Sequence, residues 1–531
     1  MQHPITGAQL IGYTESSLGA ETFSTTNPRD GKHTPWSFRE TTKEELQKAV
    51  EMASSAFIPF QELPGARRGE FLEAVAGELE AVSAELVEVY TLESGLPEAR
   101  ARGELGRTTG QLRAFADLAR KDSWRMARID AAQPDRQPVP KPDIRKCLYP
   151  LGPVAVFGAS NFPFAFSTAG GDTASALAVG CPVVVKGHPM HAGTGEAVGR
   201  CVQKAARETG MPEGVFSHLQ SSGISLGEQL VQHLLIKGVG FTGSRKAGLA
   251  LSRLGQERAI PIPVFAEMGS INPVVVLPSA TEESGGWAKA YAQSVTLGSG
   301  QFCTNPGLIL GIAGPSWDRF VRSLALEISQ VPAGCMLHRG MADRFRTLRE
   351  ELLSQQGVTV LESNQEESGE AMVGGTVARV SGSDFCGNPS LQQEVFGPFT
   401  LTVGCSGREE LLRAVQILEG QLTASILGDP EEIGREPELL RALKDKAGRL
   451  LFNGVPTGVE VCPSMHHGGP FPATTDARFT SVGTDAALRW VRPISFQNTP
   501  QQFLPPVLRD ENPLGIWRMV NGEFSRKNSV V

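Results

Sequence analysis

One cysteine of this 531-residue chain stands in a sequence context suited to nucleophilic chemistry. Cys303 ends the segment Gly300-Gln-Phe-Cys303, which follows a helical pattern and a Gly-Ser-Gly turn. This position predicts a thiol on a loop with its backbone N–H free, and a nucleophilic cysteine needs such exposure. A free cysteine is more often a buried packing residue. The assignment therefore depends on which other groups the chain brings to this loop.

Two polar residues follow predicted strands at positions where they could assist that thiol. Glu267, in Phe265-Ala-Glu-Met-Gly269, ends a strand and is expected at the carboxyl edge of its sheet. Asn161 follows the predicted strand 154–157, where its side-chain amide could donate to an oxyanion. The ordinary alternatives are a surface charge for Glu267 and an Asx turn for Asn161.

An acid and an aromatic ring, Glu394 and Phe396, are presented together in the segment Gln393-Glu-Val-Phe-Gly-Pro398. A turn that carries both groups is suited to holding a ribose and backing a flat ring. Parallel sheets bind their ligands beyond the carboxyl ends of their strands.

Three other motif matches are discounted. Gly238-Val-Gly-Phe-Thr-Gly243 fits the dinucleotide fingerprint G-x-G-x-x-G, but the predicted strand runs through its glycines instead of ending before them. Gly223-Ile-Ser225-Leu-Gly227 fits the nucleophile elbow of α/β-hydrolases, yet a supporting Asp and His cannot be placed. Ser225 is therefore interpreted as a loop serine. His466 and His467 are adjacent, so they point differently and are interpreted as a loop pair with no third metal ligand near.

Short β-rich runs alternate with helical ones from residue 152 onward. This rhythm predicts an α/β fold with a doubly wound, Rossmann-like parallel sheet and right-handed crossovers. The predicted strands are 154–157, 182–186, 215–219 and 239–242, and the predicted helices are 168–179, 194–208, 223–235 and 244–254. Upstream, Thr42 and Glu45 are spaced as a capping box, and residues 70–90 carry apolar side chains at helical spacing. These earlier helices are expected to cover the sheet.

The pattern divides the chain into three parts. Residues 1–130 and 151–263 are predicted to form a dinucleotide-binding domain, and residues 264–483 an α/β catalytic domain. The proline-rich segment 131–150 and residues 484–531 are predicted to form a β oligomerisation arm and a C-terminal extension. The weak alternation of residues 489–505 suits pairing with another chain or with the segment 131–150.

Composition excludes several classes of protein. A hydrophobic fraction of 40% and a charged fraction of 20% are typical of a soluble globular chain. The net charge is −7 and no basic run occurs, so neither nucleic acid nor a membrane is expected as a partner. The eight cysteines are scattered without a C-x-x-C pair, which predicts neither a metal site nor disulfides. The start lacks a basic region followed by an apolar run, which predicts a cytoplasmic protein.

These segments together resemble the aldehyde dehydrogenase superfamily. The resemblance covers about residues 25–483 and rests, in order, on Asn161, Lys186, Phe241-Thr-Gly-Ser244, Glu267-Met-Gly269, Gly300-Gln-Phe-Cys303 and Glu394-Val-Phe-Gly-Pro398. Within the superfamily the chain looks most like the bacterial α-ketoglutaric semialdehyde (2,5-dioxovalerate) dehydrogenases. That narrower similarity rests on Phe157-Gly-Ala-Ser-Asn-Phe-Pro-Phe164, Ala169-Gly-Gly-Asp172 and Val185-Lys-Gly-His-Pro189.

The resemblance implies oxidation of an aldehyde to a carboxylate. Cys303 would attack the aldehyde to give a thiohemiacetal, and the Asn161 amide with the Cys303 N–H would hold its oxyanion. Hydride would leave to the nicotinamide, and Glu267 would activate water to hydrolyse the thioester, a role that favours a raised pKa. The cofactor residues that the resemblance implies are Lys186 for the adenosine ribose, Gly243 and Ser244 for the pyrophosphate, and Glu394 and Phe396 for the nicotinamide ribose and ring.

Departures from the family pattern bear on the cofactor and the substrate. Ser160 replaces a common aromatic, Gly269-Ser270 replaces Gly-Gly, and His466-His-Gly-Gly-Pro-Phe-Pro472 replaces a lysine-containing glycine loop. Many NAD-using relatives carry a glutamate three residues after the strand-end lysine, where it repels a 2′-phosphate. Here that residue is Pro189, and His188 offers a further donor. This predicts NADP as the preferred cofactor, with NAD as the alternative.

The predicted function is NADP-dependent oxidation of 2,5-dioxopentanoate to 2-oxoglutarate by a homodimer or homotetramer. Several phenylalanines near the expected site would equally suit an alkyl chain, and the sequence does not identify a basic group for a substrate carboxylate. A medium- or long-chain fatty aldehyde dehydrogenase is therefore an alternative. Two alternatives of other classes are a serine hydrolase that uses Ser225 and a non-catalytic dinucleotide-binding scaffold. The phenylalanines are Phe162, Phe164, Phe166 and Phe302.

Overall fold

A seven-stranded sheet forms the framework of the first domain in the computed structural model, which describes residues 4–282, 284–364 and 369–529. Residues 1–3, part of the start examined for a secretory signal, lie outside the described residues. The strand order is β11-β10-β7-β8-β9-β1-β2, and the five strands from β11 to β9 run parallel. Their bounds are β1 Gln9–Ile11, β2 Thr14–Ser16, β7 Val154–Phe157, β8 Val183–Lys186, β9 Phe216–Leu219, β10 Gly238–Thr242 and β11 Val264–Glu267.

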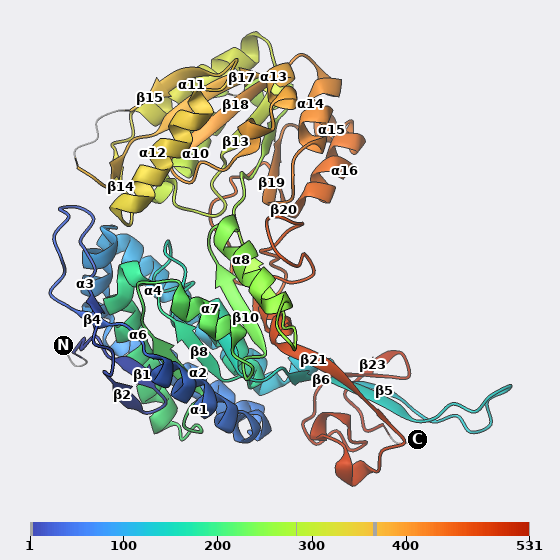
Figure 1. The fold of residues 1–531 in the computed structure, drawn as a ribbon. Helices are drawn as coiled ribbons and strands as arrows, with labels where there is room; N and C mark the ends of the chain where they lie inside the picture. The colour runs from blue at the N-terminus through green and yellow to red at the C-terminus, as the bar shows by residue number, and fades with distance from the viewer. Residues whose placement is uncertain (1–3, 283, 365–368, 530–531) are drawn as a thin grey trace.

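Helices cover both faces of this sheet, as the alternating pattern predicts (Figure 1). Side chains of odd and even strand positions enter different cores, because successive residues of a strand face opposite sides. Val183 and Val185 pack with helices α2 to α6, whereas Val184 packs with α1, α7 and α8. The helices are α1 Lys43–Glu62, α2 Gly65–Ala81, α3 Ser83–Ser94, α4 Glu98–Lys121, α5 Gly171–Val179, α6 Ala192–Glu208, α7 Ser225–Gln232 and α8 Arg245–Gln256. The expected capping box of Thr42 and Glu45 begins α1.

A second seven-stranded sheet, in the order β15-β17-β18-β13-β12-β19-β20, forms the upper domain of Figure 1. All its neighbours pair in parallel except β15, which runs antiparallel to β17. The strands are β12 Val274–Val276, β13 Leu308–Ile312, β15 Thr359–Ser363, β17 Thr376–Ser381, β18 Phe399–Cys405, β19 Gln421–Leu427 and β20 Ala447–Phe452. The principal helices are α10 Ser284–Thr296, α11 Pro315–Ser329, α12 Arg339–Leu353, α14 Arg408–Gln416 and α16 Pro437–Lys446.

The expected boundary between residues 263 and 264 separates β11 from the sheet to which it belongs. β11 pairs in parallel with β10, so the first sheet includes Glu267. The chain also returns to this sheet after the second domain, since the Met268 N–H donates to the Ala473 carbonyl at 2.8 Å. Trp490 is buried in the first core, and its indole N–H donates to Ser175 at 2.8 Å.

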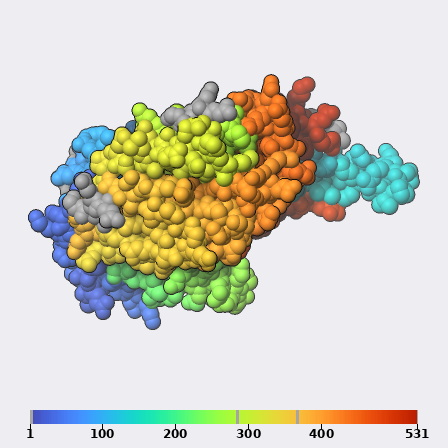
Figure 2. Space-filling model, turned by 90° about the horizontal axis from the view of Figure 1, so that it is seen from above, coloured from blue at the N-terminus to red at the C-terminus, as the bar shows by residue number. Residues whose placement is uncertain are grey.

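A five-stranded sheet, in the order β21-β6-β5-β22-β23, projects from the body of the molecule (Figures 1 and 2). β6 (Ile144–Pro150) pairs antiparallel with β21 (Val491–Gln497) along their full lengths. Of the two pairings expected for residues 489–505, the chain therefore makes the one with its own segment 131–150. The remaining strands are β5 Arg128–Asp130, β22 Arg518–Val520 and β23 Glu523–Ser525.

The discounted motifs occupy ordinary positions in the fold. β10 runs through the glycines of the segment 238–243, as predicted. Ser225 is the exposed first residue of α7, and its hydroxyl accepts a hydrogen bond from Gln229 at 2.8 Å. Residues 154–185, in which Asp172 is the one charged residue, form β7, a loop, α5 and β8. Within the described residues, no helix has the length and apolar character needed to cross a membrane.

Candidate active site

A left-handed turn precedes Cys303, whose thiol lies beside the end of β11. Gly298, Ser299 and Gly300, in the 3₁₀ segment η3 (Leu297–Gly300) after α10, have φ values of 54°, 58° and 66°. A Cβ atom on Gly300 would lie 2.1 Å from the carbonyl carbon of Gly397. Only glycine allows this close approach, which brings the cysteine loop against the turn that carries Glu394.

Asn272, a residue that sequence reasoning missed, fixes the cysteine loop to the end of the first sheet. It is fully buried and has a φ of 47°. Its side-chain amide donates to the carbonyls of Cys303 at 2.8 Å and Asn305 at 2.9 Å. Gln421, at the start of β19, accepts from the Asn272 N–H at 3.2 Å and from the Ile271 N–H at 2.8 Å. These bonds satisfy otherwise buried polar groups and set the position of the loop.

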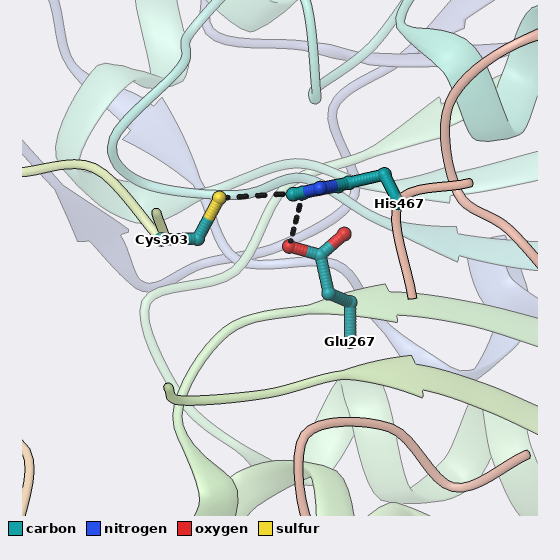
Figure 3. A group of neighbouring side chains, drawn as sticks. All are labelled: Glu267, Cys303 and His467. Carbon is teal, nitrogen blue, oxygen red and sulfur yellow. Dashed lines mark hydrogen bonds and ion pairs between the residues drawn. The ribbon is translucent and has the colours of Figure 1, made fainter. Parts of the chain in front are cut away.

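The Glu267 carboxylate lies beside Cys303, as the sequence predicts, but it is joined there by His467 (Figure 3). The His467 Nε2 atom is 3.0 Å from Glu267 Oε1 and 3.4 Å from the Cys303 Sγ. Ser481 donates to the second carboxylate oxygen of Glu267. Glu267 is 4% exposed and His467 1% exposed, whereas Cys303 is partly exposed.

The interpretation of His467 as a member of a loop pair is therefore wrong. The thiol of Cys303 and the carboxylate of Glu267 are its near neighbours, and the three ligand-type atoms lie within 4.8 Å of one another. The His467 N–H donates to Thr480 at 2.8 Å, and its carbonyl accepts from the Ser481 N–H at 2.9 Å, so the ring is held from its own backbone. The expectation of no metal site stays a prediction.

The direction of the Glu267 pKa also differs from the expectation. Burial raises the pKa of this carboxyl group, but the His467 imidazole and the hydrogen bonds from His467, Ser481 and Cys303 outweigh burial and hold it below its ordinary value. For Cys303, burial and the neighbouring Glu267 charge hold the thiol pKa well above its ordinary value. The resting site therefore pairs an ionised acid with a protonated thiol, and His467 lies between them.

The Asn161 amide is close to the cysteine loop, and it donates to the Gln301 carbonyl at 3.1 Å. Glu104, from α4, supports the loop that follows Asn161 by accepting from the backbone N–H groups of Phe164 at 2.8 Å and Ala165 at 3.0 Å. Among the described residues, no acceptor engages the Cys303 backbone N–H. The Asn161 amide and this N–H thus lie on two loops that the bond to Gln301 joins.

Glu394 and Phe396 line a hollow beside Ser270 and Phe302. The Glu394 carboxylate accepts from the Ser270 N–H at 3.2 Å, and burial raises its pKa to about 7. A Cβ on Gly269 would lie 2.2 Å from a Glu394 oxygen, so this position accepts no larger residue without moving the carboxylate.

The residues predicted to contact the adenosine end lie at the carboxyl ends of β8 and β10. The Lys186 ammonium donates to the Ser221 carbonyl at 2.9 Å, and burial lowers its pKa to about 8. Pro189 begins the 3₁₀ segment η2 (Pro189–His191), whose N-cap is His188. The His188 Nδ1 accepts from the Met190 N–H at 3.3 Å, and burial holds the pKa of His188 well below its ordinary value, so this ring is neutral.

The start of α8 is open to solvent. Gly243 and Ser244 are exposed, and Ser244 caps the helix by accepting from the Ala247 N–H at 3.4 Å. An exposed helix N-terminus of this kind attracts an anion such as a pyrophosphate. The described residues thus fit a dinucleotide, with N–H donors here, the Lys186 ammonium at β8 and the Glu394 carboxylate beside the thiol.

The sequence of the chain matches the model of the aldehyde dehydrogenase family over residues 13–470. The chain belongs to this family. It is 46% identical over 521 residues to α-ketoglutaric semialdehyde dehydrogenase 2 of Azospirillum brasilense, covering 98% of this chain and 99% of that protein. It is 44% identical over 525 residues to α-ketoglutaric semialdehyde dehydrogenase of Acinetobacter baylyi, with the same coverage of 98% and 99%.

Its fold is similar to that of betaine aldehyde dehydrogenase from Staphylococcus aureus in complex with NAD⁺. The TM-score is 0.80 at 19% identity, with 94% of this chain and 96% of that chain covered. This aldehyde dehydrogenase is therefore an NAD(P)-dependent enzyme of mixed α/β fold with parallel-sheet domains that acts on an aldehyde.

The unequal pKa values of Cys303 and Glu267 in this aldehyde dehydrogenase lead to a testable expectation. Glu267→Gln removes the negative charge and the hydrogen bond that raise the thiol pKa. Cys303 should then be alkylated faster by iodoacetamide at a fixed pH near 8, about tenfold for each unit by which its pKa falls. Mass spectrometry of the Cys303 peptide measures this rate without requiring catalytic activity.

The exposed Glu98→Gln provides a control for this alkylation, because Glu98 pairs with Arg102 at the surface. Cys303 of the Glu98→Gln variant should be alkylated at the same rate as Cys303 of the parent enzyme. Slower alkylation in Glu267→Gln would mean that Glu267 withdraws the thiol proton instead of raising the thiol pKa.

Proposed function

We propose that this aldehyde dehydrogenase oxidises α-ketoglutaric semialdehyde (2,5-dioxopentanoate) to 2-oxoglutarate, with NADP as its preferred cofactor. The observation that carries the substrate is the identity of 46% and 44%, over 98% of the chain, to two proteins of that name. The arrangement of Cys303, Glu267 and Asn161 supports the chemistry.

In the proposed reaction, Cys303 attacks the aldehyde carbon and forms a thiohemiacetal. The Asn161 amide and the free Cys303 N–H stabilise the oxygen that becomes negative in this step. NADP, held by Lys186, the start of α8 and Glu394, would supply the hydride acceptor that conversion of the thiohemiacetal to a thioester requires. Glu267 then takes a proton from water, which attacks the thioester and releases the acid.

His467 is the group in this proposal that moves the thiol proton. Its Nε2 faces both the Cys303 Sγ at 3.4 Å and Glu267 Oε1 at 3.0 Å. A lone pair on Nε2 can accept the thiol proton, and the resulting N–H can donate to the Glu267 carboxylate. Once Nε2 carries this proton, its N–H offsets the lost hydration of the buried carboxylate, so His467 also positions the base.

A spectrophotometric assay of the reduced nicotinamide tests this proposal. The parent enzyme should oxidise α-ketoglutaric semialdehyde more efficiently than decanal, Cys303→Ala should lose activity, and Ser225→Ala should keep it. Glu267→Gln should slow steady turnover by about 10²- to 10⁴-fold while a first burst of reduced cofactor persists.

Each alternative has its own outcome in this assay. A preference for decanal would favour the medium- or long-chain fatty aldehyde dehydrogenase. Loss of ester hydrolysis in Ser225→Ala, with no nicotinamide reduction by the parent, would favour the serine hydrolase. Cofactor binding without turnover of any aldehyde would favour the scaffold.

The preference for NADP rests on the absence of an acid at Pro189. A like charge about 4 Å from the 2′-phosphate would cost on the order of 4 kcal/mol at an effective dielectric constant near 20. Because His188 is neutral, Lys186 is the cation of this loop that would attract the phosphate. Glu40 acts against it, since its carboxylate accepts from the Ser222 N–H at 2.9 Å and lies near enough to raise the pKa of Lys186.

Two substitutions of opposite effect test this electrostatic argument. Pro189→Glu should lower kcat/KM for NADP relative to NAD, and Glu40→Gln should raise it. Each change should be about 5- to 150-fold, after solvent screening reduces the charge effect to about 1–3 kcal/mol. Steady-state kinetics with both cofactors measure the ratio. A parent that uses NAD as well as NADP, or variants that leave the ratio unchanged, would refute the argument.

The proposal extends to a homo-oligomer built through the projecting sheet. The arm exposes large apolar side chains, which are costly to leave in water on a narrow projection. They are Val139, Phe503, Trp517 and Phe524, with exposed fractions of 61%, 69%, 60% and 72%.

The eight cysteines, all free, suit a reducing compartment such as the cytoplasm, where we place the enzyme.

Light scattering after size exclusion should give a mass of two or four chains of 56.8 kDa. The double variant Trp517→Ser, Phe524→Ser should shift this mass toward one chain, because it removes apolar surface from the arm. Ile224→Ser, which changes an 80% exposed residue on the body of the first domain, is the control and should keep the parental mass. A parent that elutes as a monomer would exclude the oligomer.

A further inference from the structure

Arg107, on α4, is a partly buried cation that forms no ion pair in the described part of the chain, although Glu104 and Glu460 lie near enough to raise its pKa. Its Nε and Nη2 atoms are buried and make no hydrogen bond, whereas Nη1 donates to the Val459 carbonyl. These two unsatisfied atoms form one edge of the guanidinium group. That edge presents two parallel N–H donors, which match the two oxygens of a carboxylate.

The guanidinium of Arg107 is stacked near the reacting thiol. It lies over the ring of Phe166, 5.6 Å from the ring centroid. Phe166 in turn lies against His467, with 6.4 Å between ring centroids, and His467 contacts Cys303. A carboxylate that met Arg107 would therefore be held within a few carbon atoms of Cys303.

Arg449, at β20, reinforces the positive character of this region. It donates to the carbonyls of Gly458 at 3.1 Å and of Pro456, next to the carbonyl of Val459 that Arg107 uses. Its Nε atom is also buried without a partner, and no described carboxylate forms an ion pair with it. The charges of Arg107 and Arg449 both act on the Cys303 thiol, which places both near the nucleophile.

The neighbouring Arg100 differs, because its charge is already used. Its Nε atom forms an ion pair with Glu104 at 3.3 Å. Its guanidinium lies between the rings of Phe162 and Phe302, 4.5 and 4.6 Å from their centroids. Arg100 therefore stabilises the aromatic wall, and Arg107 is the arginine of α4 whose buried donors are unpaired among the described residues.

Leaving two N–H donors of a buried guanidinium unsatisfied is costly, because each has lost its water. An anion that enters with the substrate removes this cost, whereas a neutral alkyl chain does not. We propose that Arg107 binds the carboxylate of the aldehyde substrate and so selects aldehyde acids over neutral aldehydes, an inference that rests on the proposed function for the identity of that acid. Arg449, which donates to the neighbouring carbonyls of Pro456 and Gly458, adds positive charge.

Kinetics with a charged and a neutral aldehyde of the same carbon number test this role. The pair is α-ketoglutaric semialdehyde and pentanal, each with saturating NADP. Arg107→Met should lower kcat/KM for α-ketoglutaric semialdehyde about 10- to 100-fold and leave kcat/KM for pentanal within about twofold. Arg107→Lys should recover part of the loss, since a lysine keeps the charge but not the parallel donors.

Two measurements separate substrate binding from a structural role. Arg102→Met, on the same helix, changes an exposed arginine that pairs with Glu98, and it should behave as the parent. In addition, 2-oxoglutarate should raise the Tm of the parent and of Arg102→Met but not that of Arg107→Met. An equal loss of activity toward both aldehydes in Arg107→Met, or an unchanged ratio of their kcat/KM values, would overturn the proposal.

The same data distinguish failure of Arg107 from failure of the proposed substrate. If the parent prefers another aldehyde acid, such as succinic semialdehyde, and Arg107→Met removes that preference, the substrate identity is wrong and the role of Arg107 stands. If the parent prefers α-ketoglutaric semialdehyde and Arg107→Met retains that preference, the substrate stands and Arg107 is wrong. A parent that prefers pentanal would overturn both.

Discussion

The burial of the Glu267 carboxylate against the Cys303 thiol is the constraint on which the rest of the site depends. An ionised group that is 4% exposed must replace its lost hydration, which otherwise costs several kcal/mol. His467 contacts one oxygen and Ser481 donates to the other. Both residues belong to the segment that follows the second sheet, so the charge at the end of β11 requires that segment to return to the first sheet.

This requirement accounts for the joining of two sheets around one site. The returning chain is fixed to the first sheet by the bond from Met268 N–H to the Ala473 carbonyl and by an isolated bridge between Glu267 and Thr474. A few residues after β11, Asn272 holds the cysteine loop of the second domain. The segment from β11 to Asn272 therefore contacts the base, its partners and the nucleophile, and a shift of either domain would separate the acid from the thiol.

The sequence predicts those parts of the site that lie beside a strong local pattern. The strand 154–157 has the predicted bounds, and Asn161 follows it; Glu267 ends β11, and Cys303 follows a glycine turn. His467 could not be placed, because 164 residues separate it from Cys303 and no local pattern records the return of the chain. The expected raised pKa of Glu267 is wrong for the same reason. The sequence indicates that this carboxyl group is buried, but it does not indicate that His467 and Ser481 contact it and lower its pKa.

The boundary at residues 263 and 264 shows a related limit. A change of pattern along the chain marks where one element ends, but sheet membership is decided by pairing with a strand that can lie far away in sequence. The sequence predicts the strand that Glu267 ends, but only the parallel register with β10 assigns this strand to the first sheet. The arm illustrates the opposite case, where an alternating segment paired with the proline-rich segment as expected.

The aromatic residues near the thiol contact arginine side chains in the folded chain, which changes the substrate that they suit. Phe162 and Phe302 enclose Arg100, and Phe166 carries Arg107 on its face. A wall built only to hold an alkyl chain would have no use for guanidinium groups, because each must be desolvated beside it. The ring faces instead stabilise cations through their electron-rich centres. The same phenylalanines that would suit an apolar substrate in the sequence therefore hold cations in the folded chain, which supports the proposed aldehyde acid as the substrate.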